Sequence, residues 1–133
     1  MSNIDWEALR AAAESARQYA HAPYSNFSVG AAVLTTDGTI FGGSNVENAS
    51  YGAAICAERS AIVAAVTAGK KNLRALTIVT GANSPTPPCG ICRQFISEFA
   101  QDLPIKSVTS DGAIADYNLK DLLPHAFDAD QLE

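Results

Sequence analysis

The stretch LRALTIVT, residues 73–80, is almost continuously apolar and consists largely of residues found in β-strands. A strand with this composition belongs in a sheet that is covered on both faces, because both rows of its side chains must be buried. Helical and strand-like patterns alternate on either side of it. The chain is therefore predicted to be an α/β protein, with a three-layer αβα arrangement in which helices flank a mixed five-stranded sheet.

The residues before this strand divide into short periodic segments. Apolar residues recur at three- and four-residue spacing over 5–20, which is typical of a helix. Asp37-Gly38 is a hairpin turn signal between two β-prone runs. The expected elements, in order, are a helix over 5–20, strands over 29–35 and 39–45, a polar loop over 44–54, and a helix over 56–68 that Gly69 closes.

The residues after the strand complete the order αββαβαββα. A turn over 110–112 is too short for a parallel crossover, so the strands on its two sides are expected to pair antiparallel. With 133 residues the chain has the length of one domain, 1–133. The expected elements are a proline-rich loop over 84–88, a helix over 90–100, strands over 105–109 and 113–117, and a helical turn over 119–123 that ends at Pro124.

Charge and hydropathy exclude several classes of partner. The formal net charge is -5, and the basic residues form no patch, so nucleic acid is not an expected partner. No run of about 18 apolar residues is present, and the N-terminus has no signal-peptide pattern. We therefore expect a soluble, cytoplasmic protein with no membrane partner.

The three cysteines lie in two short motifs. An odd, small number of cysteines argues against a disulfide framework and favours metal binding or catalysis. Cys89 and Cys92 form a Cys-x-x-Cys pair at the start of a predicted helix, which places both sulfurs on one face of its first turn. Alone, this pair fits a redox dithiol as well as half a zinc site. Cys56 lies at another predicted helix start, and helix N-termini stabilise thiolates.

The rest of the ligand set has two readings. A structural Cys₃His zinc site would use His21 or His125, although neither histidine belongs to a ligand-spaced motif. A catalytic site would leave one position to water. Glu58, two residues after Cys56, favours the catalytic reading because its carboxylate can reach a metal-bound water without ligating the metal. As a lone residue, Glu58 could equally be a carboxylate that favours a helix N-terminus.

Taken together, the motifs resemble the short, homotetrameric cytidine deaminases. The resemblance extends over nearly the whole chain, and its segments are PYSNF at 23–27, NVEN at 45–48, CAER at 56–59, PCGICRQ at 88–94 and LLP at 122–124. It implies zinc-dependent hydrolytic deamination of cytidine and deoxycytidine, with one Zn²⁺ per chain and a nucleoside as the small-molecule substrate. Cys56, Cys89 and Cys92 would hold the metal, water would be its fourth ligand, and Glu58 would move the protons.

The resemblance also assigns the substrate contacts. Asn45 and Glu47 would bind the ribose 3′-hydroxyl, and Phe27 would pack against the pyrimidine. The backbone N–H of Ala57 would hold the base carbonyl, while the carbonyl of Pro87 would face the leaving amino group. The family positions that enter a neighbouring subunit's pocket would be Ala49, Tyr51 and Phe127, the last aligned only through the preceding LLP segment, with His125 where glycine is expected.

Two features outside the motifs bear on assembly and metal chemistry. The helix over 57–68 is apolar on almost every face, so we expect it to be buried all round, against another subunit as well as the sheet or else at the centre of a monomer. The resemblance favours another subunit and implies a homotetramer with shared active sites. Three thiolates would leave a bound Zn²⁺ with a formal charge of −1, which weakens its ability to acidify water. Arg59 could offset that charge by hydrogen-bonding the thiolates; a solvent-facing arginine is the alternative.

Other functions are compatible with part of this pattern. A sister enzyme could deaminate a modified nucleoside such as blasticidin S or a free base, but a ribose-binding Asn45 and Glu47 argue against both. A zinc-stabilised module without catalytic activity would have no use for Glu58. A redox protein would need only Cys89 and Cys92.

Overall fold

The computed structural model describes residues 3–132. Its elements follow the expected αββαβαββα order, with two short 3₁₀ turns that the sequence patterns did not predict. The elements are α1 (Trp6–Arg17), β1 (Val29–Thr35), β2 (Ile40–Ser44), a 3₁₀ turn (Tyr51–Ala53), α2 (Ala57–Thr67), β3 (Leu73–Thr80), α3 (Gly90–Ser97), β4 (Pro104–Thr109), β5 (Ile114–Asn118), α4 (Leu119–Leu122) and a second 3₁₀ turn (Ala129–Leu132).

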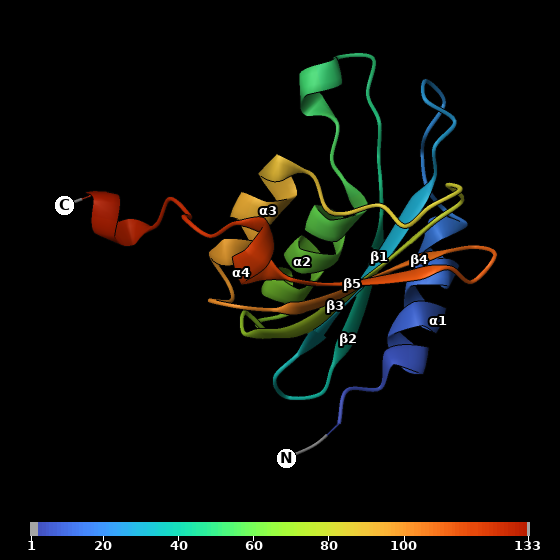
Figure 1. The fold of residues 1–133 in the computed structure, drawn as a ribbon. Helices are drawn as coiled ribbons and strands as arrows, with labels where there is room; N and C mark the ends of the chain where they lie inside the picture. The colour runs from blue at the N-terminus through green and yellow to red at the C-terminus, as the bar shows by residue number, and fades with distance from the viewer. Residues whose placement is uncertain (1–2, 133) are drawn as a thin grey trace.

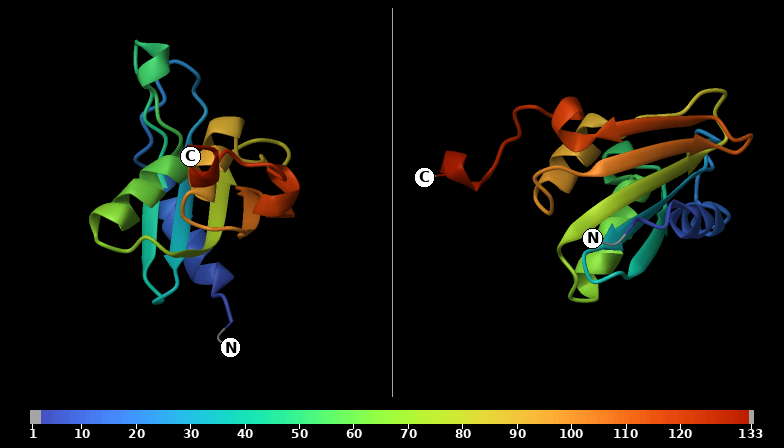
Figure 2. Two further views of the ribbon diagram at one scale, coloured as in Figure 1. Left: turned by 90° about the vertical axis from the view of Figure 1, so that its left-hand side faces the viewer. Right: turned by 60° about the horizontal axis from the view of Figure 1, so that its bottom comes forward.

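The strands form one mixed sheet in the order β2-β1-β3-β4-β5. The pair β3 and β4 is parallel, and the other three pairs are antiparallel, including the predicted β4–β5 hairpin. Helix α1 covers one face of the sheet, while α2, α3 and α4 lie on the other (Figures 1 and 2). The prediction of a three-layer αβα fold with five strands is confirmed.

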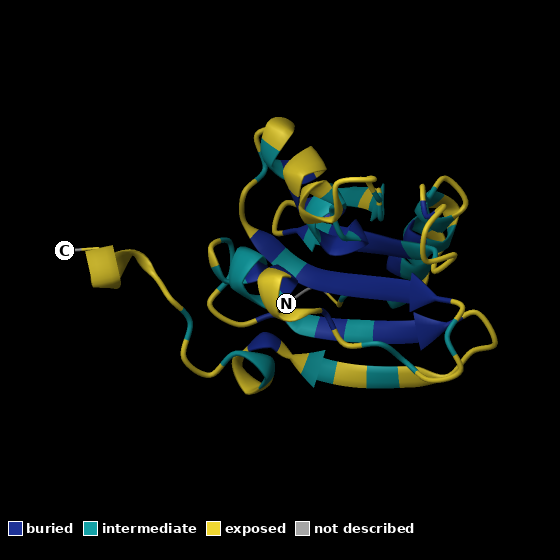
Figure 3. Ribbon diagram, turned by 90° about the horizontal axis from the view of Figure 1, so that it is seen from above, coloured by how far each residue is buried: buried dark blue, intermediate teal, exposed yellow. Residues whose placement is uncertain are grey.

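Strand β3 is buried on both faces, as its composition predicted. Leu76 and Ile78 pack into the core beneath α2, whereas Ala75 and Val79 point to the opposite core with Leu9 of α1. In Figure 3 the central strands are almost entirely dark blue, and the edge strand β5 alternates between exposed and half-buried residues. Both layers of helices are therefore anchored on the same central strands.

Helices α1 and α3 each end three residues earlier than predicted. Asp5 caps α1 by accepting a hydrogen bond from the backbone N–H of Ala8 at 3.0 Å. Beyond both C-termini the backbone changes to i→i+3 bonds, which tighten and end the helix. Within residues 3–132, no helix combines the length and the apolar composition that a membrane span requires.

In the single chain, helix α2 is buried on one face only, so the expected burial of its other face against another subunit stays a prediction. Ala61, Ile62 and Ala65 are buried against the sheet, but Val63 is 41% exposed and Ala64 is also exposed. Helix α2 packs one face on β1 and β2, and no further layer among residues 3–132 covers its outer face.

Strand direction brings three connections to one edge of the sheet. Strand β1 runs antiparallel to both β2 and β3, so it starts where they end. The register shows this directly, since Val29 pairs with Thr80 and Gly30 pairs with Ser44. The segments before β1, after β2 and after β3 consequently meet at the same edge.

We predict that Gly43→Ala destabilises the fold by about 1–3 kcal/mol, the usual range for overpacking. Gly43 lies where β2 meets α2, and a Cβ there would sit 2.3 Å from the backbone N of Ala61. Urea unfolding measures the change. Gly52→Ala is the matched control, because a Cβ at Gly52 meets nothing within 4 Å. Equal stability of the two variants would contradict close α2–β2 packing.

Candidate active site

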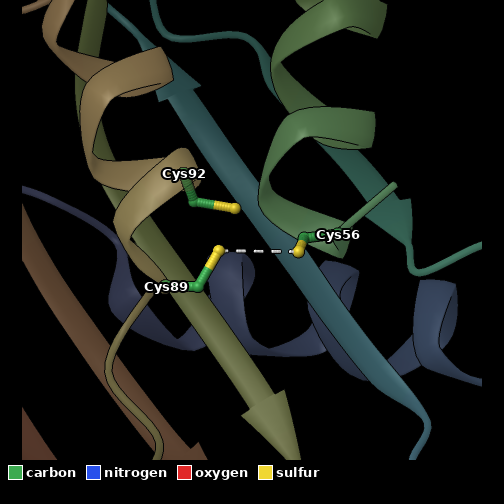
Figure 4. Close-up of side chains that lie close together, drawn as sticks. All are labelled: Cys56, Cys89 and Cys92. Carbon is green, nitrogen blue, oxygen red and sulfur yellow. Dashed lines mark hydrogen bonds between the residues drawn. The ribbon is translucent and has the colours of Figure 1, made fainter. Parts of the chain in front are cut away.

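Two helix N-termini bring the three cysteines together. Cys56 is the N-cap of α2 and Cys89 the N-cap of α3, and neither sulfur caps its own helix. Cys92 lies in the first turn of α3, so its sulfur points back toward the other two (Figure 4). The three sulfurs lie within 4.8 Å of one another, and those of Cys56 and Cys89, 33 residues apart in sequence, are 3.8 Å apart.

The thiols of Cys56 and Cys92 do not ionise alike. Hydrogen bonding from Cys92, with further help from Arg59 and Cys89, lowers the pKa of Cys56 well below that of an ordinary thiol. Hydrogen bonding to Cys56, followed by burial, raises the pKa of Cys92. The cluster therefore readily carries one negative charge, and a divalent cation can displace the remaining protons. Three soft sulfur donors at this spacing fit zinc.

Arg59 lies beside the sulfurs rather than in solvent. Its Nη2 atom is 3.8 Å from the sulfur of Cys56, within reach of a long hydrogen bond to sulfur. Its Nε atom is buried and has no hydrogen-bond partner among residues 3–132. The guanidinium consequently places positive charge next to the thiolates. There it can offset the negative charge that three thiolates would give to a bound zinc ion.

Glu58 is buried in the same place. Its residue is 5% exposed, although carboxylates are seldom buried without a paired cation. Burial, together with the negative charge of Cys56, raises the pKa of Glu58 to about 7. A carboxyl group with such a pKa is present in both its acidic and its basic form near neutral pH, which is the property that a general acid–base needs.

A cavity of about 490 Å³ opens beside the sulfurs at the edge where the three connections meet. Its volume is in the usual range for a small-molecule pocket. All five residues predicted to contact substrate within their own chain line it: Phe27, Asn45, Glu47, Ala57 and Pro87. Tyr51, one of the three positions predicted to enter a neighbouring subunit's pocket, lines it as well. Ala49 and Phe127 do not line it. Both are exposed, and Phe127 lies in the C-terminal tail that extends from the body of the molecule (Figure 1).

Asn45 and Glu47 hold the segment that carries Phe27. The Asn45 amide accepts a hydrogen bond from the N–H of Val29 and donates one to the carbonyl of Phe27, both at 2.8 Å. Glu47 accepts from the backbone N–H groups of Tyr24 and Ser25 at 2.9 and 3.1 Å. These contacts order one wall of the cavity before any ligand is bound.

Sequence reasoning missed Ser25, Thr86 and Ile91, which also line the cavity. Ser25 donates its hydroxyl proton to Glu47 and accepts the N–H of Phe27 at 3.0 Å. The bond from Ser25 is the main cause that holds the pKa of Glu47 below its ordinary value. Ser25 lies in the PYSNF segment at 23–27, so the sequence did contain a signal for it. No local sequence pattern distinguishes Thr86 or Ile91 from ordinary loop and surface residues.

The two histidines are not part of the sulfur cluster. The backbone of His21 bridges 45–47, donating to the carbonyl of Asn45 at 3.0 Å and accepting from the N–H of Glu47 at 2.7 Å. His125 is exposed in the C-terminal tail. Among residues 3–132, the group able to hold a metal consists of the three cysteines alone.

Comparison with known proteins places the chain in a family. The model of the cytidine and deoxycytidylate deaminase zinc-binding region matches residues 3–106. A curated cytidine deaminase from Sporosarcina psychrophila is 42% identical over 130 residues, which is 97% of this chain and 96% of that protein. The chain belongs to the cytidine and deoxycytidylate deaminase zinc-binding family, and its cofactor is Zn²⁺, one ion per chain.

Solved structures agree with this assignment. The crystal structure of cytidine deaminase from Burkholderia pseudomallei matches with a TM-score of 0.89 at 44% identity, covering 93% of this chain and 100% of that one. The crystal structure of cytidine deaminase from Mycobacterium tuberculosis matches with a TM-score of 0.82 at 42% identity, covering 95% and 99%. The family predicted from the sequence motifs is confirmed.

We predict that replacing any one of the three cysteines by alanine removes zinc and lowers the unfolding temperature, because metal binding is coupled to folding. Metal analysis of the purified variants, with thermal unfolding, measures both effects. His21→Ala and His125→Ala are the controls and should retain one zinc per chain. Full zinc occupancy in Cys92→Ala, or zinc loss in a histidine variant, would contradict this ligand set.

Proposed function

We propose that this chain catalyses the hydrolytic deamination of cytidine and deoxycytidine to uridine and deoxyuridine, with release of ammonia, in pyrimidine salvage. The observation that carries the proposal is the buried Glu58 beside three convergent sulfurs in a cavity that also contains Asn45 and Glu47. The relatives are cytidine deaminases over nearly their whole length. Residues 1–133 would form a single catalytic domain, in the cytoplasm, where thiols remain reduced.

The three cysteines would hold the zinc ion. The chemistry supplied by bound zinc is Lewis acidity, which makes water nucleophilic near neutral pH. Arg59 would draw electron density from the thiolates, because its guanidinium lies against the sulfur of Cys56. Electropositive partners of metal-ligating atoms commonly tune the metal in this way.

Glu58 would move the protons of the reaction. It would accept a proton from the attacking water and deliver it to N3 of the ring. It would then take the proton of the new C4 hydroxyl and deliver it to the departing amino group, which leaves as ammonia. One carboxyl group suffices because N3 and the amino group lie on the same edge of the pyrimidine. Its pKa of about 7 allows it to act first as base and then as acid.

The nucleoside would be positioned by the cavity walls. Phe27 would pack against the base, while the Ala57 N–H and the Pro87 carbonyl would contact its polar edges. Asn45 and Glu47 would bind the ribose 3′-hydroxyl. Glu47 is suited to this because its lowered pKa keeps it ionised, and an ionised acceptor makes the stronger hydrogen bond.

We predict that Glu58→Gln retains zinc and fold but lowers the turnover of cytidine by roughly 10²- to 10⁴-fold, the range for loss of a general acid–base. The decrease in cytidine absorbance measures turnover, with a chelator-treated sample of the parent as a second reference. Glu98→Gln, an exposed glutamate on the same side of the sheet, is the control. Near-parent activity in Glu58→Gln would mean that another group moves the protons.

The exposed apolar residues support a homotetramer with shared sites. Tyr51 is 80% exposed and Phe127 59% exposed, and Val63 on α2 is also uncovered. Gln94 holds the tail by two hydrogen bonds to the backbone of Phe127, at 2.7 and 3.2 Å, which leaves the ring directed outward. Ala49, Tyr51 and Phe127 would complete the pocket of a neighbouring subunit.

We predict that light scattering gives a mass of about four chains, as expected for a closed symmetric assembly. Deleting the tail from Phe127 onward should lower activity while zinc stays bound, because the ligands lie elsewhere. Deleting only the residues after Asp130, which leaves Phe127 in place, is the matched control. A fully active monomer would refute the shared pocket.

A further inference from the structure

Ser107 is a fully buried serine under the wall of the cavity. It lies on β4 with 0% exposure and pairs with Ile78 of β3 in the parallel register. Paired residues of neighbouring strands point to the same face of a sheet, and Ile78 lines the cavity. Ser107 therefore lies on the cavity side of the sheet without lining the cavity itself.

The hydroxyl of Ser107 holds the proline-rich loop at Thr86. It accepts a hydrogen bond from the Thr86 N–H at 3.0 Å and donates one to the Thr86 carbonyl at 2.7 Å. Three prolines, at 85, 87 and 88, surround Thr86, and proline has no N–H to donate. Thr86 thus has the only backbone N–H donor of residues 85–88, and the hydroxyl of Ser107 accepts its hydrogen bond.

The loop has a second anchor at its far end. Arg93 donates from Nε to the carbonyl of Pro88 at 2.8 Å. Between the two anchors lies Pro87, which lines the cavity and whose carbonyl accepts no hydrogen bond within residues 3–132. Ser107 binds Thr86 and Arg93 binds Pro88, so the residues on both sides of Pro87 are fixed. These two anchors restrict the direction of the Pro87 carbonyl.

We propose that Ser107 is a positioning residue that sets the Pro87 carbonyl against the amino edge of the pyrimidine. This inference rests on the proposed function. It concerns a position just beyond residues 3–106, the range that the family model matches. Ser107 acts through Thr86 and touches neither substrate nor metal ligand, so removing it should affect the reacting edge of the base and leave zinc in place.

Ser107→Ala tests this role. It leaves both Thr86 groups unpaired, and we expect kcat for cytidine to fall by about 10- to 100-fold, because small displacements of a positioning group have effects of that size. Zinc content should not change. Inhibition by uridine, which has no amino group for Pro87 to contact, should stay within about twofold of the parent.

Thr77→Val is the matched control. Thr77 lies on β3 at 1% exposure, and its hydroxyl has no partner among residues 3–132. It is one residue from Ile78 and faces the opposite side of the sheet. Removing this hydroxyl tests the effect of a polar-to-apolar change in the interior of the same sheet, away from the cavity, and kcat should stay at the parent value. Ser107→Thr retains a hydroxyl and should restore most of the kcat lost in Ser107→Ala.

Amide hydrogen exchange at Thr86 gives a readout independent of activity. The Thr86 N–H should be protected in the folded parent and in Thr77→Val, and should exchange rapidly in Ser107→Ala. Rapid exchange in the parent would overturn the inference even if Ser107→Ala failed to fold.

The two proposals fail in different ways. An active parent whose Ser107→Ala variant keeps both the parent kcat and the Thr86 protection would overturn the inference alone. A fall in unfolding temperature with unchanged kcat would also overturn it, because Ser107 would then be a purely structural residue. A parent that does not deaminate cytidine would overturn the proposed function, and this inference with it.

Discussion

The antiparallel position of β1 between β2 and β3 is the constraint on which the site depends. Hydrogen-bonded ladders fix strand direction, so β1 must start at the edge where its two neighbours end. The three connections at that edge carry Phe27, the Asn45–Glu47 segment with Cys56, and Pro87 with Cys89. A cavity bordered by these connections is a consequence of the topology, and the side chains then determine what the cavity can bind.

The same arrangement places two helix N-termini side by side. The N-terminal turns of α2 and α3 have exposed N–H groups and a partial positive charge, and both begin with cysteine. This field stabilises thiolates, which zinc requires, and Arg59 adds a full positive charge next to Cys56. Burying the carboxyl group of Glu58 beside thiolates costs stability. The same burial raises its pKa to about 7, which makes Glu58 suitable for proton transfer.

Side chains hold two walls of the cavity by hydrogen bonds to the backbone. The segment before β1 is bound by Asn45, Glu47 and Ser25, and the proline-rich loop after β3 is bound by Ser107 and Arg93. Each of these residues satisfies backbone groups that would otherwise be left unpaired near the cavity. A preorganised wall of this kind favours a productive substrate geometry without reorganisation during the reaction.

The sequence by itself determined what is local. Residues 73–80 specified a doubly covered strand, Gly69 the end of α2, and the spacing of Cys89 and Cys92 a shared helical face. The resemblance carried by the short motifs identified the family and the cofactor. The apolar outer face of α2 indicated that it can be covered, but a single chain does not show which partner covers it.

Tertiary structure decided everything that depends on residues far apart in the chain. Three long-range contacts leave no signal in any short stretch of the sequence. They are the approach of Cys56 to Cys89, the hydrogen bonds of Ser107 to Thr86, and those of Asn45 to Phe27 and Val29. The physical reason is that these contacts follow from strand register and direction, which long-range hydrogen bonds set. A serine in a strand has the same local pattern whether its hydroxyl meets water or holds a catalytic loop.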